Sequence, residues 1–345
     1  METRMSRPSH WRASLWLALG LLAWRGADAG TLPGPLVETP WLAENLDKVV
    51  VLDVRDDSDS FEKRSAKEGA PVNPCGVAKK PADDFNVFGH IPKAALIPFK
   101  NLQVKRKVGE VELKGLYPSK EEFEKLMQEA GVNNDSALVI TSKGMSVKDA
   151  FQQTLLYWAL KYYGHDNLAI LNGGTAQWLL DKREVEFGKT SPTKGAFKAG
   201  TERPEILATT EQVTKRLEAG AEGEQLVDVR GKDLYWGLTL NASMVPPQGK
   251  GHIPTAKNFP VVFMVNSMGP AARFYTKDEV LKVAELSKID TGKPTTLYCD
   301  SGANASLGWF VWSEVLGNKQ ARLYDGSMNE YTNTGTRPLT LMKNE

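Results

Sequence analysis

The sequence has 345 residues, of which 41% are apolar and 25% charged, with 43 basic and 42 acidic side chains. These proportions are typical of a folded soluble protein and exclude the disordered, collagen-like and disulfide-rich classes. A net charge of +1 argues against a nucleic-acid-binding protein, and we expect the basic run Lys105–Lys107 to be a solvated loop. The two cysteines, Cys75 and Cys299, allow at most one disulfide and are too few for a zinc site with several thiolates.

The first 29 residues have the three parts of a secretory signal peptide. Three arginines precede the apolar run Ala13–Trp24, and the small-x-small triplet Ala27-Asp28-Ala29 follows it. This run is well short of the ~20 residues that a membrane-spanning helix needs. We therefore expect cleavage after Ala29 and an exported protein, periplasmic or secreted, with no stable membrane anchor.

The rest of the chain contains one pattern twice. Each copy has an apolar strand ending in Asp-Val-Arg, a Gly-His-Ile-Pro motif, a second apolar strand, a helix, and a short strand before a glycine turn. The paired segments, first copy and then second, are 48–55 and 225–230, 89–94 and 251–256, 137–140 and 295–298, 147–163 and 304–315, and 168–174 and 321–327.

Apolar, β-branched strands that alternate with helices predict an α/β fold in which a parallel β-sheet is flanked by helices. The repeat predicts two such domains, at residues 30–190 and 205–345. Residues 191–204 continue a stretch rich in Gly, Pro, Thr and Lys and are the expected linker. Residues 62–88 form an insertion that we expect to be a surface loop.

The two copies differ at the end of the second strand, where Cys299 stands in place of Thr141. A side chain there, in a glycine-containing loop that opens a helix, lies in the crevice where α/β sheets bind ligands. Loop N–H groups and the helix N-terminus would favour the thiolate and make Cys299 a nucleophile. The alternative is that Cys299 is a small buried apolar residue.

With its motifs in this order, the chain resembles the tandem-domain rhodanese-family sulfurtransferases of the thiosulfate and 3-mercaptopyruvate types. The matching pieces are Asp-Val-Arg, Gly-His-Ile-Pro-x-Ala, the Cys-x-x-Gly loop and the signature from Ala321 to Tyr331. The resemblance implies two rhodanese-like domains, the first of which has lost its cysteine. It also implies that the Cys299 thiolate takes a sulfane sulfur from a small anionic donor, and that a thiol or cyanide then removes it.

The persulfide implied by the resemblance carries extra negative charge, which the N–H groups of the active-site loop can stabilise without a metal. We therefore expect neither a metal nor an organic cofactor. Gly302 lets the backbone turn tightly enough for those groups to point inward. The predicted loop consists of Asp300, Ser301, Gly302, Ala303, Asn304 and Ala305.

Departures from the family pattern concern the substrate contacts. Asp300 stands beside the nucleophile, where thiosulfate-type loops have cations and a carboxylate opposes a thiolate. Ser301 resembles the serine of the mercaptopyruvate type, which implies a proton-handling role together with His90. Leu234 occupies the place of the substrate-binding arginine, for which Lys232 or Lys250 is a candidate substitute.

Residues that recur in both copies favour structural roles, because one copy lacks the cysteine. This applies to Asp228, His252 and Arg230, although Arg230 stays a candidate for substrate contact. It also weakens the case for His90 as a proton-handling residue. We expect Trp309 and Trp312 to lie in the core or at the domain interface. Cys75 is either an unpaired surface cysteine or a partner that locks Cys299 in a disulfide.

Two other functions are alternatives to the sulfurtransferase hypothesis. One is a non-enzymatic persulfide carrier or oxyanion-binding module that serves a partner protein, which the missing loop cations favour. The other is a phosphatase or arsenate reductase with a Cys-x5-Arg loop. Ala305 stands where that arginine would be, which argues against the second alternative.

Overall fold

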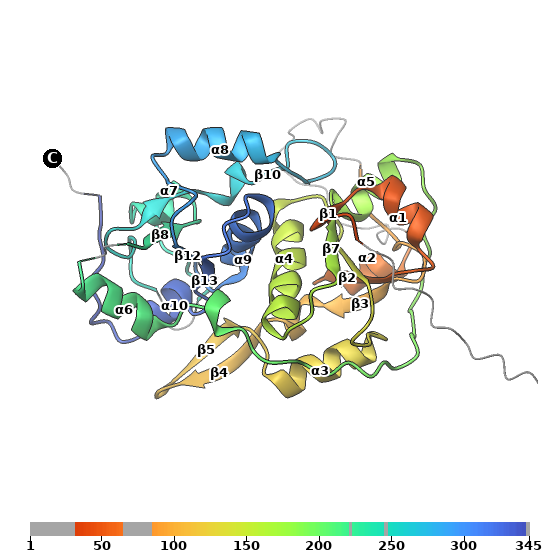
Figure 1. The fold of residues 1–345 in the computed structure, drawn as a ribbon, viewed down its shortest axis with the longest axis horizontal. Helices are drawn as coiled ribbons and strands as arrows, with labels where there is room; N and C mark the ends of the chain where they lie inside the picture. Colours follow the sequence, from red (N-terminus) through yellow and green to blue (C-terminus); the bar gives the residue numbers. More distant parts are fainter. Residues whose placement is uncertain (1–31, 65–84, 221–222, 245–247, 343–345) are drawn as a thin grey trace, which may run out of the picture.

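The computed structural model describes residues 32–64, 85–220, 223–244 and 248–342 as two α/β domains (Figure 1). The predicted signal peptide, Cys75 and most of the predicted insertion lie outside these residues. Within the described ranges, no helix has the length and apolar character that crossing a membrane requires.

The N-terminal domain is built on a parallel sheet of five strands in the order β1-β7-β6-β2-β3. Its central strands are apolar and buried because helices cover both faces of the sheet. Its elements are β1 (Leu36–Val37), α1 (Thr39–Asn45), β2 (Val50–Arg55), α2 (Ser58–Glu62), β3 (Ala95–Pro98), η2 (Phe99–Asn101), β4 (Val104–Val108), β5 (Val111–Leu116), α3 (Lys120–Glu129), β6 (Leu138–Thr141), α4 (Val147–Tyr162), β7 (Leu168–Leu171) and α5 (Gly174–Leu180).

The C-terminal domain repeats this plan with a parallel sheet in the order β13-β12-β8-β9. A bridge between Leu207 and Leu323 takes the place that β1 has in the first domain. Its elements are η3 (Pro204–Ile206), α6 (Thr210–Glu218), β8 (Gln225–Asp228), α7 (Lys232–Tyr235), β9 (Lys257–Asn258), η4 (Val261–Phe263), β10 (Val265–Asn266), β11 (Arg273–Phe274), α8 (Lys277–Leu286), β12 (Thr295–Tyr298), α9 (Ala303–Phe310), a π-helical turn η5 (Val311–Val315), β13 (Ala321–Leu323) and α10 (Ser327–Tyr331). The predicted parallel sheets flanked by helices are confirmed.

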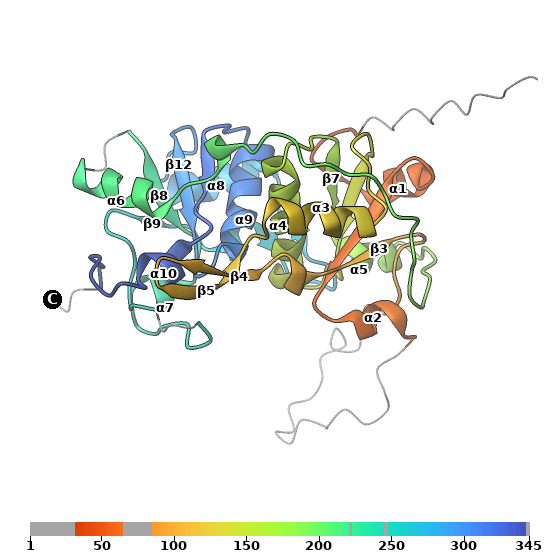
Figure 2. The ribbon, with the colours of Figure 1, turned by 90° about the horizontal axis from the view of Figure 1, so that it is seen from below.

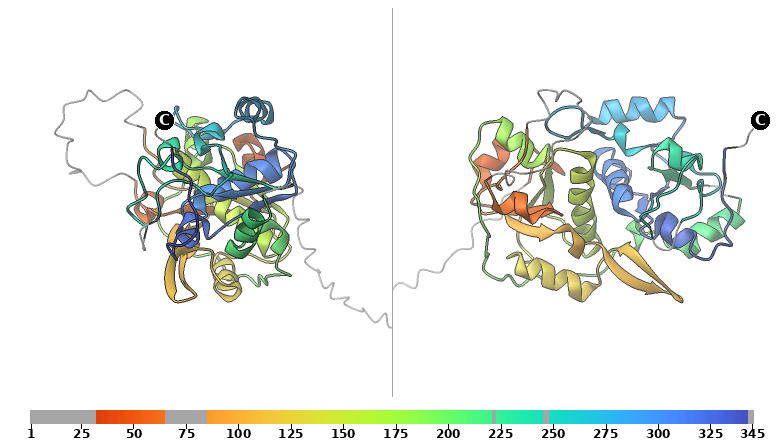
Figure 3. Two further views of the ribbon diagram at one scale, coloured as in Figure 1. Left: turned by 90° about the vertical axis from the view of Figure 1, so that its left-hand side faces the viewer. Right: turned by 180° about the vertical axis from the view of Figure 1, so that it is seen from behind.

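The two domains share one hydrophobic core, because α4 and α9 lie side by side between the sheets (Figures 1 and 3). Tyr157 of α4 packs edge-on against Phe310 of α9, with ring centroids 4.9 Å apart. The Thr154 and Ser306 hydroxyls hydrogen-bond across this contact at 2.9 Å. Trp309 and Trp312 are both buried, in the place expected for core or interface residues.

The segment 191–204 packs along the N-terminal domain. Phe197 is buried there, and its backbone N–H donates to the Val132 carbonyl oxygen at 3.0 Å. The N–H of Gly200 donates to the Tyr163 carbonyl oxygen at 2.8 Å. This connection is therefore held by the first domain along much of its length.

Each domain sends a hairpin to the other, which the sequence did not indicate. Hairpin β4–β5 of the first domain reaches α10 of the second, as seen from below in Figure 2. Hairpin β10–β11 of the second domain contacts the first domain in turn, where the Ala272 N–H donates to the Gly144 carbonyl oxygen at 2.7 Å. The basic run Lys105–Lys107 lies in strand β4, so its prediction as a loop is wrong.

Candidate active site

Cys299 follows the last residue of β12, in the loop that leads into α9. The backbone N–H groups of Ser301 and Ala305 lower the pKa of its thiol, because they stabilise negative charge on the sulfur. Gly302 turns the loop with φ +83°, and a Cβ at that position would lie 2.5 Å from Oδ1 of Asp325. The loop therefore requires glycine for two reasons, its left-handed backbone and this close approach.

Ser327 holds the loop from the opposite side, at the start of α10. Its hydroxyl accepts the N–H groups of Cys299 at 3.0 Å and Gly302 at 3.2 Å, and it lies 4.0 Å from the sulfur. Ser327 has φ +48°, which is uncommon for a residue other than glycine. The first domain has Gly174 at this place in the repeat, so the exchange of glycine for serine was the signal that sequence reasoning missed.

The thiol of Cys299 is buried, with a residue exposure of 1%. Burial raises its pKa to about 11, the Asp300 carboxylate adds to the rise, and the Ser301 and Ala305 N–H groups and the Ser327 hydroxyl oppose it. The loop N–H groups therefore favour the thiolate, as expected, but the net pKa lies above the ordinary value for a cysteine. The N–H groups are in place, but removal of water and a neighbouring carboxylate outweigh them.

Asp300 turns away from open solvent and is held by three groups. Its carboxylate lies 3.5 Å from Nη1 of Arg230 and accepts from the Asn241 side chain at 3.1 Å. Its carbonyl oxygen accepts from the Gln248 side chain at 3.0 Å. Burial raises the pKa of Asp300, and the charge of Arg230 opposes that rise.

Arg230 is buried and belongs to the framework of the domain. It forms an ion pair with Asp228 at 2.7 Å and donates to the Gly251 carbonyl oxygen at 2.7 Å. In the first domain, Arg55 makes the same pair with Asp53 at 2.7 Å and donates to the Gly89 carbonyl oxygen at 3.0 Å. A geometry that recurs where there is no cysteine favours the structural role for both arginines.

The two motif histidines also match each other. His90 stacks on Phe61 with ring centroids 3.9 Å apart, and His252 stacks on Tyr235 at 3.7 Å. His90 is buried inside the N-terminal domain, where its backbone pairs with Glu186, and among the described residues no hydrogen bond or ring contact joins it to Ser301. The structure therefore does not bring together the predicted pair of His90 and Ser301.

Ser301 instead faces hairpin β4–β5 of the other domain. A Cβ on Gly115 would lie 3.0 Å from the Cβ of Ser301, and the Gln103 amide lies 3.5 Å from the Ser301 carbonyl oxygen. A cavity of about 340 Å³ opens beside this contact, between the domains. Its lining residues are Asp56, Phe99, Lys100, Gln103, Lys114, Gly115, Ser243, Met244 and Ser301.

The remaining predicted residues divide between the loop and the surface. Ala303 and Ala305 are buried at the start of α9, and Asn304 is half-buried. Lys232 and Lys250 are exposed and do not line the cavity at Ser301, and Lys232 lies over the Trp236 ring at 5.8 Å. Among the described residues, no group of three or more His, Cys, Asp or Glu side chains has a metal-binding arrangement.

A family model described as the rhodanese-like domain matches residues 38–181 and 209–334. A protein of Saccharopolyspora erythraea provisionally named thiosulfate sulfurtransferase is 31% identical over 304 residues, which cover 86% of this chain and 92% of that protein. A sulfur carrier protein of Thermus thermophilus is 29% identical over 87% of this chain and 94% of its own length.

Among solved structures, a 3-mercaptopyruvate sulfurtransferase of Escherichia coli superimposes with a TM-score of 0.63 and 26% identity, covering 85% of this chain and 98% of that one. The chain therefore belongs to the family of rhodanese-like domain proteins, with one such domain in each half. Within that family it is a sulfurtransferase.

Proposed function

We propose that this sulfurtransferase moves a sulfane sulfur from a donor such as thiosulfate or 3-mercaptopyruvate to a thiol or cyanide, through a persulfide on Cys299. The observation that carries the proposal is the position of this cysteine at the end of β12, in a loop where the N–H groups of two residues lower the pKa of its thiol. In the first domain, Thr141 stands at this place and offers no thiol.

The first half-reaction with thiosulfate proceeds as follows. Cys299 loses its proton to solvent, and the thiolate attacks the outer sulfur of the donor. The sulfur–sulfur bond of thiosulfate breaks, and sulfite leaves with the bonding electron pair. The negative charge of the new persulfide is then stabilised by the Ser301 and Ala305 N–H groups and by the N-terminus of α9.

The second half-reaction returns the enzyme to its starting state. A thiolate or cyanide attacks the outer sulfur of the persulfide, and the Cys299 thiolate leaves. Cys299 is 1% exposed, so both half-reactions require the sulfur to become accessible to the substrates. A pKa of about 11 means that turnover rises with pH through the neutral range.

Steady-state turnover separates the proposal from its main alternative. We expect wild-type protein to form thiocyanate from thiosulfate and cyanide, with complete loss in Cys299→Ala. Cys75→Ala is the matched control, because it removes the other cysteine of the chain and should retain activity. A Cys299→Ala variant with undiminished turnover would refute the proposal.

A second candidate is a persulfide carrier that passes sulfur to a partner protein. The carboxylate of Asp300 beside the thiol favours it, because this charge disfavours an anionic donor, and so does the likeness to the Thermus sulfur carrier. Such a carrier would hold one sulfur on Cys299 and show no turnover with small acceptors.

We also propose that residues 1–29 direct export and are removed. Their arginines, apolar run and small-x-small end support this proposal. N-terminal sequencing of the protein from its native source should begin at Gly30, and a mature protein that begins at Met1 would contradict export by this route.

A further inference from the structure

The cavity at Ser301 collects positive charge from the N-terminal domain. Lys100 follows β3 in η2, and Lys114 lies in β5, so both reach the cavity from elements that face the catalytic loop. Neither lysine has a carboxylate within 4.0 Å among the described residues. The one carboxylate in the lining, Asp56, is paired with Lys148.

The catalytic loop itself supplies no free cation. Arg230 shares its charge with Asp228 and Asp300, and the residues after Cys299 are an aspartate and a serine. Lys100 and Lys114, from the other domain, are the two cations that line the cavity at Ser301. They lie across the domain interface from Ser301, whose N–H group lowers the pKa of Cys299.

The cavity at Ser301 has a volume of about 340 Å³ and is open to solvent, so it admits a thiol larger than cyanide or thiosulfate. Charge, rather than volume, selects the occupant, because the lining offers two ammonium groups to the carboxylates of a small acidic thiol.

We propose that Lys100 and Lys114 bind the carboxylates of an acidic thiol acceptor and so determine acceptor specificity. This inference rests on the proposed persulfide chemistry of Cys299. The thiol end of the acceptor lies toward Ser301 and attacks the outer sulfur of the persulfide. The bond between the two sulfurs of the persulfide breaks, and Cys299 leaves as the thiolate.

The test compares two acceptors in wild-type protein and in a Lys100→Ala/Lys114→Ala variant. Glutathione carries two carboxylates and 2-mercaptoethanol carries none. We expect the KM for glutathione to rise roughly tenfold and the KM for 2-mercaptoethanol to stay unchanged, with persulfide formation intact. The wild-type preference for glutathione should also weaken as salt is added, because exposed charges are screened.

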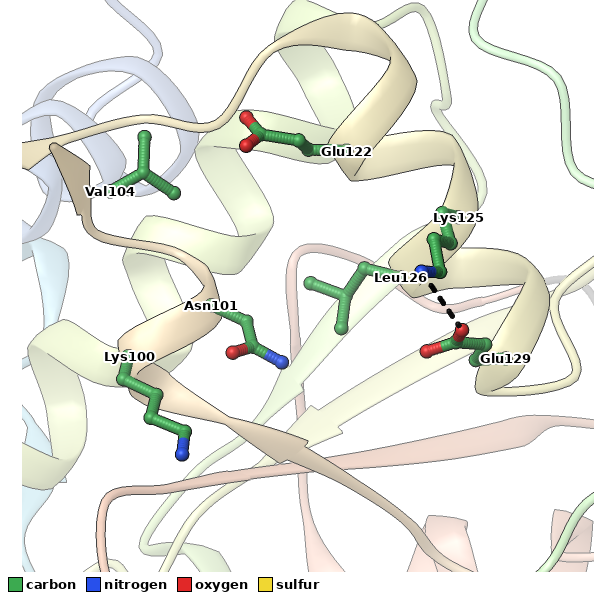
Figure 4. A pocket seen from close by; sticks show the side chains of 7 residues that line it. All are labelled: Lys100, Asn101, Val104, Glu122, Lys125, Leu126 and Glu129. Atoms are coloured by element: carbon green, nitrogen blue, oxygen red, sulfur yellow. Dashed lines mark ion pairs between the residues drawn. The ribbon is translucent and has the colours of Figure 1, made fainter. Parts of the chain in front are cut away.

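A matched variant, Lys48→Ala/Lys198→Ala, removes two exposed lysines that pack on the same domain. Lys48 donates to the Asn45 side chain at 3.3 Å, Lys198 pairs with Glu124 at 3.1 Å, and neither lines the cavity at Ser301. This variant should leave both KM values unchanged. Lys105 and Lys125 are unsuitable as controls, because Lys105 lies opposite Lys114 in hairpin β4–β5 and Lys125 shares a second cavity, of about 250 Å³, with Lys100 (Figure 4).

The outcomes separate the inference from the proposed function. If wild-type protein forms no persulfide, the proposed function fails. If it forms one, but the Lys100→Ala/Lys114→Ala variant keeps the wild-type KM for glutathione, the inference is overturned while the proposed function stands. The same holds if the KM values for glutathione and 2-mercaptoethanol rise by the same factor. If the control variant shifts the glutathione KM by the same factor, overall charge rather than this cavity selects the acceptor, and the inference is again overturned.

Discussion

Asp325 joins the two domains beside the catalytic loop, and its charge gives a measurable prediction. Its Oδ2 accepts the N–H of Tyr117 at 3.2 Å across the interface. At the same place in the first domain, the side-chain oxygen of Asn172 accepts the N–H of Phe274 at 3.0 Å. A neutral amide therefore makes the same contact, and the contact itself does not need the carboxylate.

The size of the expected change in unfolding free energy follows from the pKa shift of the buried Asp325 carboxyl. Burial raises the pKa of Asp325 from 3.8 to about 7, against the lowering effects of the Tyr117 N–H and of Arg106. Between these two values the folded protein binds more protons than the unfolded chain, so the free energy of unfolding falls as pH rises. At 1.36 kcal/mol for each pKa unit, the loss from below pH 4 to above pH 7 is about 4 kcal/mol.

The substitution Asp325→Asn removes the titrating group and keeps an acceptor for Tyr117. We expect a flatter dependence of stability on pH, with the difference from wild type appearing between pH 4 and pH 7. Urea unfolding at pH 4.5, 6 and 8 measures it, and the exposed carboxylate variant Asp59→Asn serves as the control. Parallel pH dependences in wild type and Asp325→Asn would refute the reasoning.

Two further predictions concern the loop around the sulfur. Asp300→Asn removes the neighbouring charge that raises the pKa of Cys299. The rate of Cys299 alkylation by iodoacetamide should therefore reach its half-maximum at a lower pH than in wild-type protein, and an unchanged or higher midpoint would contradict this account. Ser327→Ala removes the acceptor for the Cys299 and Gly302 N–H groups, so we expect the free energy of unfolding to fall by about 1–3 kcal/mol and persulfide formation to slow. Calorimetry measures the first effect and stopped-flow kinetics the second. Full retention of both stability and rate would argue against a role for this hydroxyl.

The repeated pattern in the sequence was enough to predict the sheets. Strand and helix periodicity are local, and the two copies support each other, so β12 and α4 lie within one or two residues of their predicted ranges. The exchange of Thr141 for Cys299 marked the catalytic loop, because a difference between copies points to chemistry where agreement points to structure.

The contacts between domains could not be predicted in this way. Tyr117 and Asp325 are 208 positions apart, and no periodicity links the hairpin β4–β5 to the catalytic loop. The pKa of Cys299 is raised mainly by burial, which is a property of the folded chain, so the direction of this shift could not be predicted from the sequence. Lys232 and Lys250 were predicted from proximity in sequence, whereas Lys100 and Lys114 reach the site through the fold.

Peptide mapping by mass spectrometry tests the central claim most directly. After incubation with thiosulfate and digestion without reductant, the account predicts a gain of about 32 Da, one sulfur atom, on the peptide that contains Cys299. The gain should disappear when cyanide is added. An unmodified Cys299 peptide, or a sulfur found on Cys75 alone, would contradict the account.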